Sequence, residues 1–326
     1  QRGKVEMTVF PHEKYKILNK IGRLFGIGHL DQQIRILLNV NKFDILYSPY
    51  SKSNTKLLLF LKAIGLFRKP IVVTIHQPFW MGRNENWFIR LYARQYILNY
   101  TASIFLSKPL LEKTVDLLEI PKKAYKDKFS LAQWGPDMTY YERYSIKRNA
   151  FEECDFFISA GHTDRDFETL IEAFRGLDYK LKIFCTPKTI PNVEVDWEVT
   201  LSYDLVPYYQ KSIAILIPLK YPKSKEGCQG MTSLQDVVTF SKPVIMTRHP
   251  CLNLDIEEEG IGYWVDMYDV NSWREKLRIL KENRDIWLEM SDKSQSTFKN
   301  KFNSEVFATH LESVLLSVYN KNNNRQ

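Results

Sequence analysis

The sequence predicts an α/β fold made of two parallel-sheet domains, and three observations support this. The chain has 326 residues, enough for two domains of roughly 100–200 residues each. Apolar strand-like segments alternate with helix-like segments, the order typical of parallel sheets. The alternation stops once, in the charged and aromatic stretch 137–155, and then restarts. We therefore expect domains over residues 1–145 and 146–302, followed by a last segment over 303–326.

In the first half, short apolar runs bounded by turn residues indicate strands, and apolar residues at helical spacing indicate helices. The strands are expected over residues 5–11, 44–49, 70–76, 102–106 and 129–134. The helices are expected over residues 30–40, 55–67, 86–98 and 109–118, the last with Pro109 in its first turn, where proline is favoured.

The second half repeats the pattern. Strands are expected over residues 155–160, 181–185, 195–201, 213–218, 243–247 and 263–265. Helices are expected over residues 166–174, 205–211, 232–240, 270–282, 284–299 and 305–319. Both halves thus predict Rossmann-like domains, in which ligands bind at the carboxyl ends of the strands.

Composition excludes several classes of protein. Hydrophobic residues make up 44% and aromatic residues 13% of the chain, too much for a disordered protein. The four cysteines include no Cys-x-x-Cys pair, which argues against a disulfide scaffold or a zinc ribbon and suits a reducing cytosol. The longest apolar run, residues 57–67, is too short to cross a bilayer and contains Lys62.

Charge is spread unevenly along the chain. Residues 1–150 hold 25 Lys and Arg against 11 Asp and Glu, a net charge of +14, whereas residues 151–326 hold 21 against 27, a net charge of −6. This asymmetry indicates that one half meets an anionic surface: nucleic acid, phospholipid headgroups or a phosphorylated ligand. The alternative is two domains that simply differ in their solvated surfaces.

One basic segment, residues 12–25, suits an anionic membrane surface. Its apolar residues fall on one helical stripe and its cations lie around them: Ile17, Leu18, Ile21, Leu24 and Phe25, with Lys14, Lys16, Lys20 and Arg23. A second group follows the strand at 70–76 and can extend this surface: Met81, Trp87 and Phe88, with Arg83 and Arg90. The alternative is an ordinary helix that packs on the core and presents a solvated basic face.

Two segments carry candidate ligand-binding residues. Arg165 follows the strand at 155–160, where a guanidinium can bind a diphosphate bidentately; alternatively, it pairs with Asp164 or Asp166 at the surface. The residues Gly230, Met231, Thr232 and Ser233 precede a predicted helix, whose free N–H groups favour phosphate.

Asp236 is expected near the first turn of that helix, where its carboxylate can accept hydrogen bonds from a ribose diol. The alternative is that Thr232 or Ser233 is an N-cap and Asp236 complements the helix dipole.

These segments resemble sequence blocks of GT-B glycosyltransferases, in particular glycosyltransferase family 4. Residues 161–173 (GHTDRDFETLIEA) resemble the block G-R-x-x-R-D-F/Y-x-x-L-I/L-x-A. Residues 230–245 (GMTSLQDVVTFSKPVI) resemble G-Q-T-T-L-L-D/E-A-M-A-x-G-K-P-V-I. Two weaker matches lie at residues 72–76 (VVTIH), similar to V-x-T-x-H-D, and 134–137 (WGPD), in the place of N-G-V-D.

The resemblance implies roles for individual residues. Arg165 matches the cation that neutralises the donor's diphosphate, Asp236 the acid that binds the ribose, and His76 the acceptor-side histidine. The donor-binding set includes Gly161, His162, Gly230, Met231, Thr232 and Ser233. The chain departs from the family at Cys228, where the first acid of the paired motif is expected; Glu226, two residues earlier, is the candidate replacement. His162 also replaces an arginine, and Gln77 replaces an aspartate.

The resemblance implies a glycosyltransferase that moves a hexose-type sugar from a UDP- or GDP-linked donor to a saccharide or polyprenyl-linked acceptor in bacterial surface-polysaccharide synthesis. Such relatives retain anomeric configuration and use no cofactor. The sequence has no paired Asp-x-Asp in a plausible metal site and no His/Cys cluster, so we expect no metal here. The expected location is cytoplasmic and peripheral, at the inner face of the plasma membrane.

The resemblance also sets expectations for both ends of the chain. Residues 1–9 resemble the end of the family's first helix and its second strand, so the first domain is expected to lack its first strand and most of its first helix. The last helix is expected to cross back to the first domain.

Two other functions stay open. A sugar-nucleotide-binding protein without transferase activity is suggested by Cys228 at an acid position. A basic nucleic-acid-binding protein is suggested by the charge, but no recognised nucleic-acid motif supports it, so we expect no nucleic-acid partner.

Overall fold

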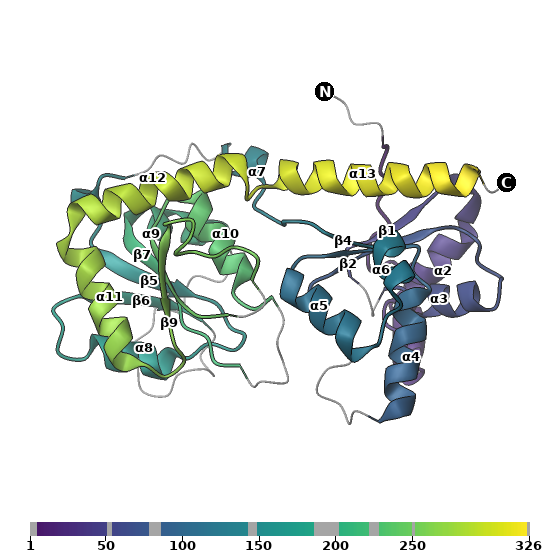
Figure 1. The fold of residues 1–326 in the computed structure, drawn as a ribbon, viewed down its shortest axis with the longest axis horizontal. Coiled ribbons are helices and arrows are strands. Elements are labelled where there is room, and N and C mark those ends of the chain that lie inside the picture. Colours follow the sequence, from purple (N-terminus) through teal and green to yellow (C-terminus); the bar gives the residue numbers. More distant parts are fainter. Residues whose placement is uncertain are drawn as a thin grey trace. The chain divides into compact units, whose positions relative to one another are not determined.

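The chain divides into two compact units. The computed structural model describes residues 5–50, 54–77, 86–142, 149–185, 202–221, 228–249 and 252–324. Unit 1 comprises Gln1–Ala132 and Ala308–Gln326, and unit 2 comprises Gln133–Phe307 (Figure 1). The domain limits expected from the sequence lie after residues 145 and 302, whereas the two units divide after residues 132 and 307. The expected limits stay predictions.

Unit 1 is built on a parallel sheet with the strand order β1-β2-β3-β4. Its strands are β1 (Leu46–Ser48), β2 (Ile71–Ile75), β3 (Ala102–Phe105) and β4 (Phe129–Leu131). Its helical elements are α1 (Lys16–Leu24), α2 (Leu30–Leu38), η1 (Val40–Lys42), α3 (Lys56–Ala63), α4 (Trp87–Leu98), α5 (Lys108–Leu117), α6 (Lys122–Lys128) and most of α13 (Ser304–Asn323). On α13, His310 Nε2 lies 3.1 Å from Ser130 Oγ of β4.

Local chemistry accounts for these elements. All residues of β2 and β3 are buried, as expected for strands of a sheet covered on both faces. The side chains of Asn86 and Ser107 cap α4 and α5 by accepting bonds from Ile89 N and Leu110 N. Each cap satisfies an N–H group that the first turn of a helix leaves without an acceptor.

The strand predicted over residues 5–11 does not form. These residues have no strand structure and are mostly exposed. Instead of pairing in the sheet, the segment is attached to α2 by side chains: Gln32 donates to Phe10 O and Arg35 donates to Pro11 O. The strand prediction for residues 5–11 was therefore wrong, because a strand also needs a neighbouring strand to satisfy its backbone. The strand predicted over residues 195–201 lies outside the described residues.

Unit 2 is built on a second parallel sheet, with the strand order β6-β5-β7-β8-β9. Its strands are β5 (Phe156–Ala160), β6 (Lys180–Phe184), β7 (Ser212–Ile217), β8 (Val244–Thr247) and β9 (Gly262–Val265). Its helical elements are α7 (Met138–Glu142), η2 (Phe151–Glu153), α8 (Phe167–Phe174), η4 (Ser202–Leu205), α9 (Val206–Lys211), α10 (Met231–Thr239), α11 (Val270–Glu282) and α12 (Arg284–Asn300). The two parallel sheets confirm the α/β prediction.

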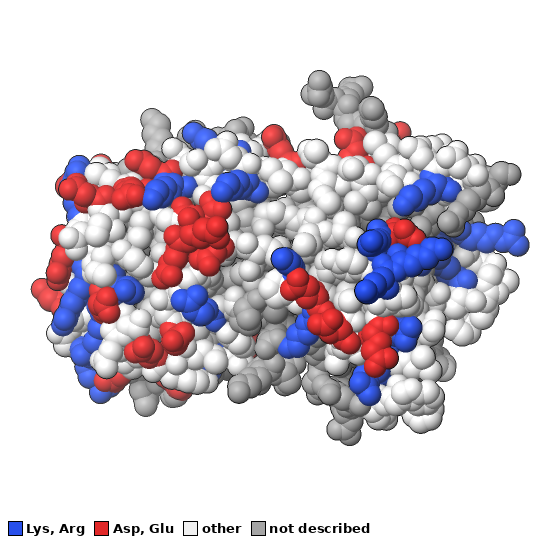
Figure 2. Space-filling view, viewed as in Figure 1, with Lys and Arg blue, Asp and Glu red and all other residues white. Residues whose placement is uncertain are grey.

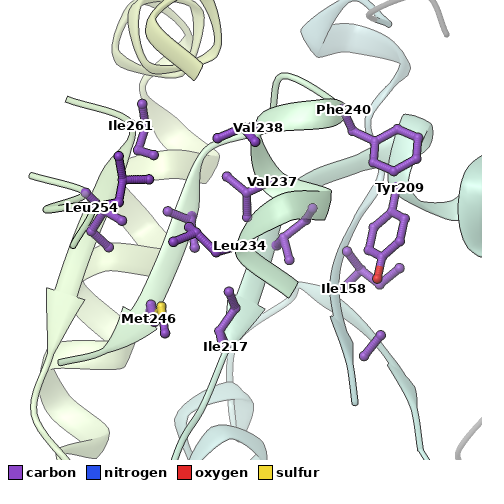
Figure 3. Packing of buried hydrophobic residues seen from close by; sticks show 14 of the residues in the cluster. Ile158, Tyr209, Ile217, Leu234, Val237, Val238, Phe240, Met246, Leu254 and Ile261 are labelled. Atoms are coloured by element: carbon purple, nitrogen blue, oxygen red, sulfur yellow. The ribbon is translucent and has the colours of Figure 1, made fainter. Parts of the chain in front are cut away.

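The unit 2 sheet has a hydrophobic core on each face. Because successive strand side chains point to opposite faces, Phe157 belongs to one core and Phe156 to the other. The first core includes residues of α8, α11 and α12, such as Trp273 and Trp287. The second core includes Leu234 and other residues of α10, shown in Figure 3. This second core fixes the start of α10 relative to the ends of the strands.

The packing of α11 predicts that substitutions at two neighbouring residues have very different effects on stability. Leu277 is completely buried, so Leu277→Ala should lower the free energy of unfolding by about 2–5 kcal/mol through lost burial and a cavity. Arg278, the next residue, is exposed, and Arg278→Ala should change stability by less than about 0.5 kcal/mol. Urea unfolding of both variants measures the difference; equal losses would contradict this packing.

Candidate functional site

The candidate site lies at the carboxyl edge of the unit 2 sheet. The strand β5 ends at Ala160 and is followed at once by Gly161, while β7 ends at Ile217. An isolated antiparallel bridge joins Arg165 to Leu219, so the loops that follow these two neighbouring strands lie together. This edge is where open parallel sheets bind their ligands.

Arg165 is buried at this edge, with only 6% of its surface exposed. Its Nη2 donates to Ser233 Oγ at 2.8 Å and to Ala160 O at 3.4 Å, and its Nη1 donates to Thr163 O at 3.2 Å. Its Nε is buried and has no hydrogen-bond partner in the described part of the chain. The guanidinium therefore meets uncharged oxygens and is not the surface ion pair that the sequence offered as an alternative.

Burial lowers the pKa of Arg165 to about 10, so the group remains a cation at neutral pH. Asp166, one of the proposed pairing partners, instead caps α8 by accepting a bond from Thr169 N. Among the described residues, no carboxylate lies within ion-pair distance of Arg165. A buried cation that has no carboxylate in ion-pair contact is costly, and an anionic ligand bound beside it reduces that cost.

Gly161 is required by the position of this guanidinium. A Cβ atom at residue 161 would lie 2.5 Å from Arg165 Nη2 and 2.8 Å from Cζ. Gly161 also has a φ of +137°, which side chains other than glycine rarely allow. The glycine of the first sequence block thus makes room for the buried cation.

The N-terminus of α10 lies beside Arg165. Gly230 is its N-cap, with φ +80°, and the helix begins at Met231. The residues Met231, Thr232 and Ser233 are therefore its first turn, which corrects the prediction that they precede the helix and that Thr232 or Ser233 is the N-cap. First-turn N–H groups lack acceptors within the helix, so this end favours anions.

The side chains of this first turn differ in their accessibility. Ser233 is buried: its hydroxyl accepts a bond from Arg165 and lies 3.3 Å from Ala160 O, to which it donates. Met231 is also buried, whereas Thr232 and His162 are exposed. Ser233 therefore holds the guanidinium, and Thr232 presents its hydroxyl to solvent.

Asp236 lies in the second turn of α10 and is half-buried. The hydroxyl of Tyr209 donates to Asp236 Oδ2 at 3.0 Å. Burial raises the pKa of Asp236 to about 7, although this hydrogen bond and the charge of Arg165 act to lower it. Tyr209 is itself buried and stacks on Phe240, with ring centroids 4.9 Å apart, as Figure 3 shows.

Sequence reasoning missed three residues at this edge. Tyr209, on α9, has no sequence pattern that links it to Asp236. His249 and Gln229 were also given no role: His249 Nε2 lies 3.1 Å from Gln229 Oε1, and Gln229 Nε2 donates to Asp164 Oδ2 at 3.5 Å. Their positions in the sequence could have indicated them, because His249 comes just after β8 and Gln229 just before α10. Both positions belong to the edge of the sheet where ligands bind.

Other predicted site residues are placed elsewhere or not described. His76 comes directly after β2 of unit 1, is half-buried, and meets the ring of Tyr50 edge-on at 5.5 Å. Burial lowers the pKa of His76. Cys228 lies in the turn before α10, whereas Glu226 lies outside the described residues. In the described ranges, no three His, Cys, Asp or Glu side chains are grouped to hold a metal ion.

The raised pKa of Asp236 predicts how stability depends on pH. The folded chain holds this proton more tightly than the unfolded chain, where the pKa is about 4, so stability falls as pH rises from about 4 to about 7. Asp236→Asn mimics the neutral acid and should therefore gain stability relative to the wild type over that interval, by a few kcal/mol at most.

Urea unfolding at about pH 4.5 and about pH 8 measures this difference. Asp285→Asn is the matched control, because the side chain of Asp285 is 99% exposed. If both variants differed from the wild type in free energy of unfolding by the same amount at both pH values, burial of Asp236 would not be the cause of the pH dependence.

Comparisons with known proteins identify the fold. No protein-family model matches the sequence, and no curated protein matches it. A glycosyltransferase from Rickettsia africae ESF-5 superimposes with a TM-score of 0.62 at 13% identity, covering 97% of this chain and 84% of that one. Anabaena HepE in complex with UDP and glucose gives a TM-score of 0.64 at 12% identity, with 95% and 86% covered.

Sucrose-phosphate synthase from Thermosynechococcus elongatus gives a TM-score of 0.62 at 12% identity, covering 90% of this chain and 79% of that one. At these identities the likeness establishes the architecture. The chain has the two-domain GT-B fold that these sugar-transferring enzymes share.

Proposed function

We propose that the protein is a glycosyltransferase that moves a hexose-type sugar from a nucleotide-diphosphate donor to a saccharide or lipid-linked acceptor. The observation that carries the proposal is Arg165, a buried cation without a described anionic partner, next to the N-terminus of α10. The known complex of Anabaena HepE with UDP and glucose supports a donor of this class on the same fold.

The chemistry of transfer explains the need for such a site. When the glycosidic bond to the donor breaks, negative charge develops on the diphosphate leaving group. A preorganised cation and aligned N–H groups stabilise that charge more than they stabilise the bound donor, which lowers the barrier. Arg165 supplies the cation, held by Ser233, and the first turn of α10 supplies the N–H groups.

Asp236 is proposed to bind the ribose of the nucleotide. Its Oδ2 accepts the bond from Tyr209, which leaves Oδ1 as an acceptor for a ribose hydroxyl. Exposed Thr232 and His162 are proposed to contact the phosphates and the sugar, with Gly161, Gly230 and Met231 shaping the backbone around them. The nucleotide is proposed to be uridine or guanosine diphosphate.

The acceptor is proposed to meet unit 1 near His76, with a saccharide or polyprenyl diphosphate as the acceptor. Glu226 is proposed to replace the acid that the family has at the position of Cys228. Transfer is proposed to proceed with retention and without a metal or other cofactor, with the diphosphate taking the proton of the attacking hydroxyl. In this reaction, the bond from the anomeric carbon to the diphosphate breaks as the bond from the same carbon to the acceptor oxygen forms.

A second candidate is a sugar-nucleotide-binding protein without turnover. It is favoured by one observation, the thiol of Cys228 in the turn before α10, because a thiol does not replace the hydrogen-bonding of a carboxylate. A nucleic-acid-binding function has no comparable support.

The diphosphate role of Arg165 predicts a selective loss of affinity. Arg165→Ala should weaken binding of UDP or GDP by about 10–100-fold, the value of a charge-assisted hydrogen bond. Binding of uridine or guanosine should change by less than about twofold, because the nucleoside lacks the phosphates. Isothermal titration measures both ligands, and equal losses for both would contradict the diphosphate role.

Two controls separate binding from folding. Arg165→Lys retains the charge and should retain part of the UDP or GDP affinity. Arg175→Ala removes a solvent-exposed guanidinium at the end of α8 and should leave both affinities unchanged. Thermal melts of all three variants show whether any loss comes from unfolding.

The transferase proposal predicts turnover as well as binding. With a panel of nucleotide sugars, the wild type should release UDP or GDP from one donor, by transfer to a saccharide acceptor or by slow hydrolysis. Asp236→Ala should lower this rate at least about tenfold through loss of ribose binding. Tight binding of a nucleotide sugar with no turnover on any acceptor or water would favour the second candidate.

A further inference from the structure

The helix α1 presents most of its apolar side chains away from the protein, and only Leu18 is half-buried. Leu24 is 84% exposed and Ile17 is 73% exposed, and Ile21 is exposed as well. The buried residues of α1 are Asn19 and Gly22. At about 100° per residue the two sets lie on opposite sides of the helix. This orientation is the reverse of an ordinary surface helix, in which the apolar stripe faces the core.

Polar contacts hold α1 in this orientation. Asn19 Oδ1 accepts a hydrogen bond from Asp31 N at 3.0 Å, and Lys14 N donates to Asp31 Oδ2 at 2.8 Å. Asp31, at the start of α2, is completely buried and forms an ion pair with Arg35 at 2.9 Å. Turning α1 to bury its apolar side would break these contacts and leave the buried carboxylate with fewer partners, which is costly.

Close backbone packing also fixes this orientation. A Cβ atom at Gly22 would lie 2.5 Å from Ile27 O and 2.6 Å from Leu30 Cβ. The glycine therefore lets α1 approach the following turn and the start of α2, and a side chain there would push the helices apart. The exposed apolar face is thus built into the packing of unit 1.

Cations flank the apolar face. At helical spacing, Lys16, Lys20 and Arg23 lie on one side of the stripe formed by Ile17, Ile21 and Leu24. All three are exposed, and none forms an ion pair with a described residue. Phe25, directly after the helix, is 70% exposed and extends the apolar surface.

We infer that α1 docks unit 1 on an anionic phospholipid surface, with the helix axis in the plane of the membrane. The side chains of Ile17, Ile21, Leu24 and Phe25 insert between the lipids, and Lys16, Lys20 and Arg23 bind the headgroup phosphates. Both features are needed: the apolar face supplies burial, and the exposed cations, which have no ion-pair partner among the described residues, complement an anionic surface rather than an apolar partner. In the described part of the chain, no helix is long and apolar enough to span a bilayer.

The inference is confined to α1 and does not depend on the proposed function. At the start of α4, the rings of Trp87 and Phe88 are also exposed and contact each other. Met81 and Arg83, which the sequence grouped with them, lie outside the described residues. Figure 2 shows a dense group of Asp and Glu side chains on unit 2. An acidic surface of this kind repels anionic lipids, so control variants can be placed in unit 2.

Vesicle co-sedimentation of the full chain tests the inference. The vesicles are pure phosphatidylcholine or phosphatidylcholine mixed with phosphatidylglycerol, without nucleotide or acceptor. The partition coefficient should be at least about tenfold higher on the anionic vesicles and should fall as salt is added. Because no turnover is measured, failure here is distinct from failure of the transferase proposal.

Two double variants separate the two contributions. Ile17→Ser with Leu24→Ser, and Lys16→Gln with Lys20→Gln, should each lower the partition coefficient on anionic vesicles by about tenfold or more. The matched controls are in unit 2: Tyr268→Ser, which removes a side chain of a residue that is 64% exposed, and Lys299→Gln on α12. Both controls should bind like the wild type. Circular dichroism and thermal melts check that every variant is folded.

Three results would overturn the inference. The first is equal binding of the wild type to both kinds of vesicle, and the second is unchanged binding of both α1 variants. The third is a dimer in sedimentation velocity that the Ile17→Ser, Leu24→Ser variant loses, with no vesicle binding by the wild type. In that case, a second copy of the chain covers the apolar face instead of a membrane.

Discussion

The hydrogen bond between Arg165 and Ser233, at 2.8 Å, joins the two segments on which the candidate site depends. It brings the segment after β5 to the first turn of α10, 68 residues further along the chain. Taking a guanidinium out of water costs free energy that backbone carbonyls and one hydroxyl offset only in part. The buried guanidinium therefore favours an anion beside it, and this property is the basis of the diphosphate role that we propose.

The other parts of the site follow from that arrangement. Gly161 is small because the guanidinium lies against it, and Gly230 takes a left-handed conformation to begin α10. The apolar side of α10 then packs on the sheet, which leaves Asp236 beside Tyr209 at the edge of the core. The acid is near enough to Arg165 to feel its charge, yet burial dominates and keeps the proton bound to about pH 7.

The amphipathic helices α1 and α10 pack in opposite orientations: α10 buries its apolar side, whereas α1 exposes its apolar side. In α10, Leu234 and Val237 are buried against strands, so the hydrophobic effect holds the helix in place. In α1, Asn19 and Gly22 are the buried residues, and hydrogen bonds to the buried Asp31 hold it. Hydrophobic periodicity identifies an apolar face in both helices, but only neighbouring residues determine which side that face meets.

The α/β architecture could be predicted from the sequence alone, because buried parallel strands and amphipathic helices have distinct periodicities. The helix over residues 270–282, for instance, has the predicted bounds. The sequence also selected Arg165 and Gly230 as candidate site residues, and the structure places Arg165 against the helix that Gly230 begins. Three outcomes became known from the folded chain alone: residues 5–11 form no strand, Tyr209 donates a hydrogen bond to Asp236, and His249 lies beside Gln229. Local periodicity reports how a segment can bury its own side chains, whereas these outcomes depend on hydrogen-bond partners that are distant in sequence and become neighbours only when the sheets assemble.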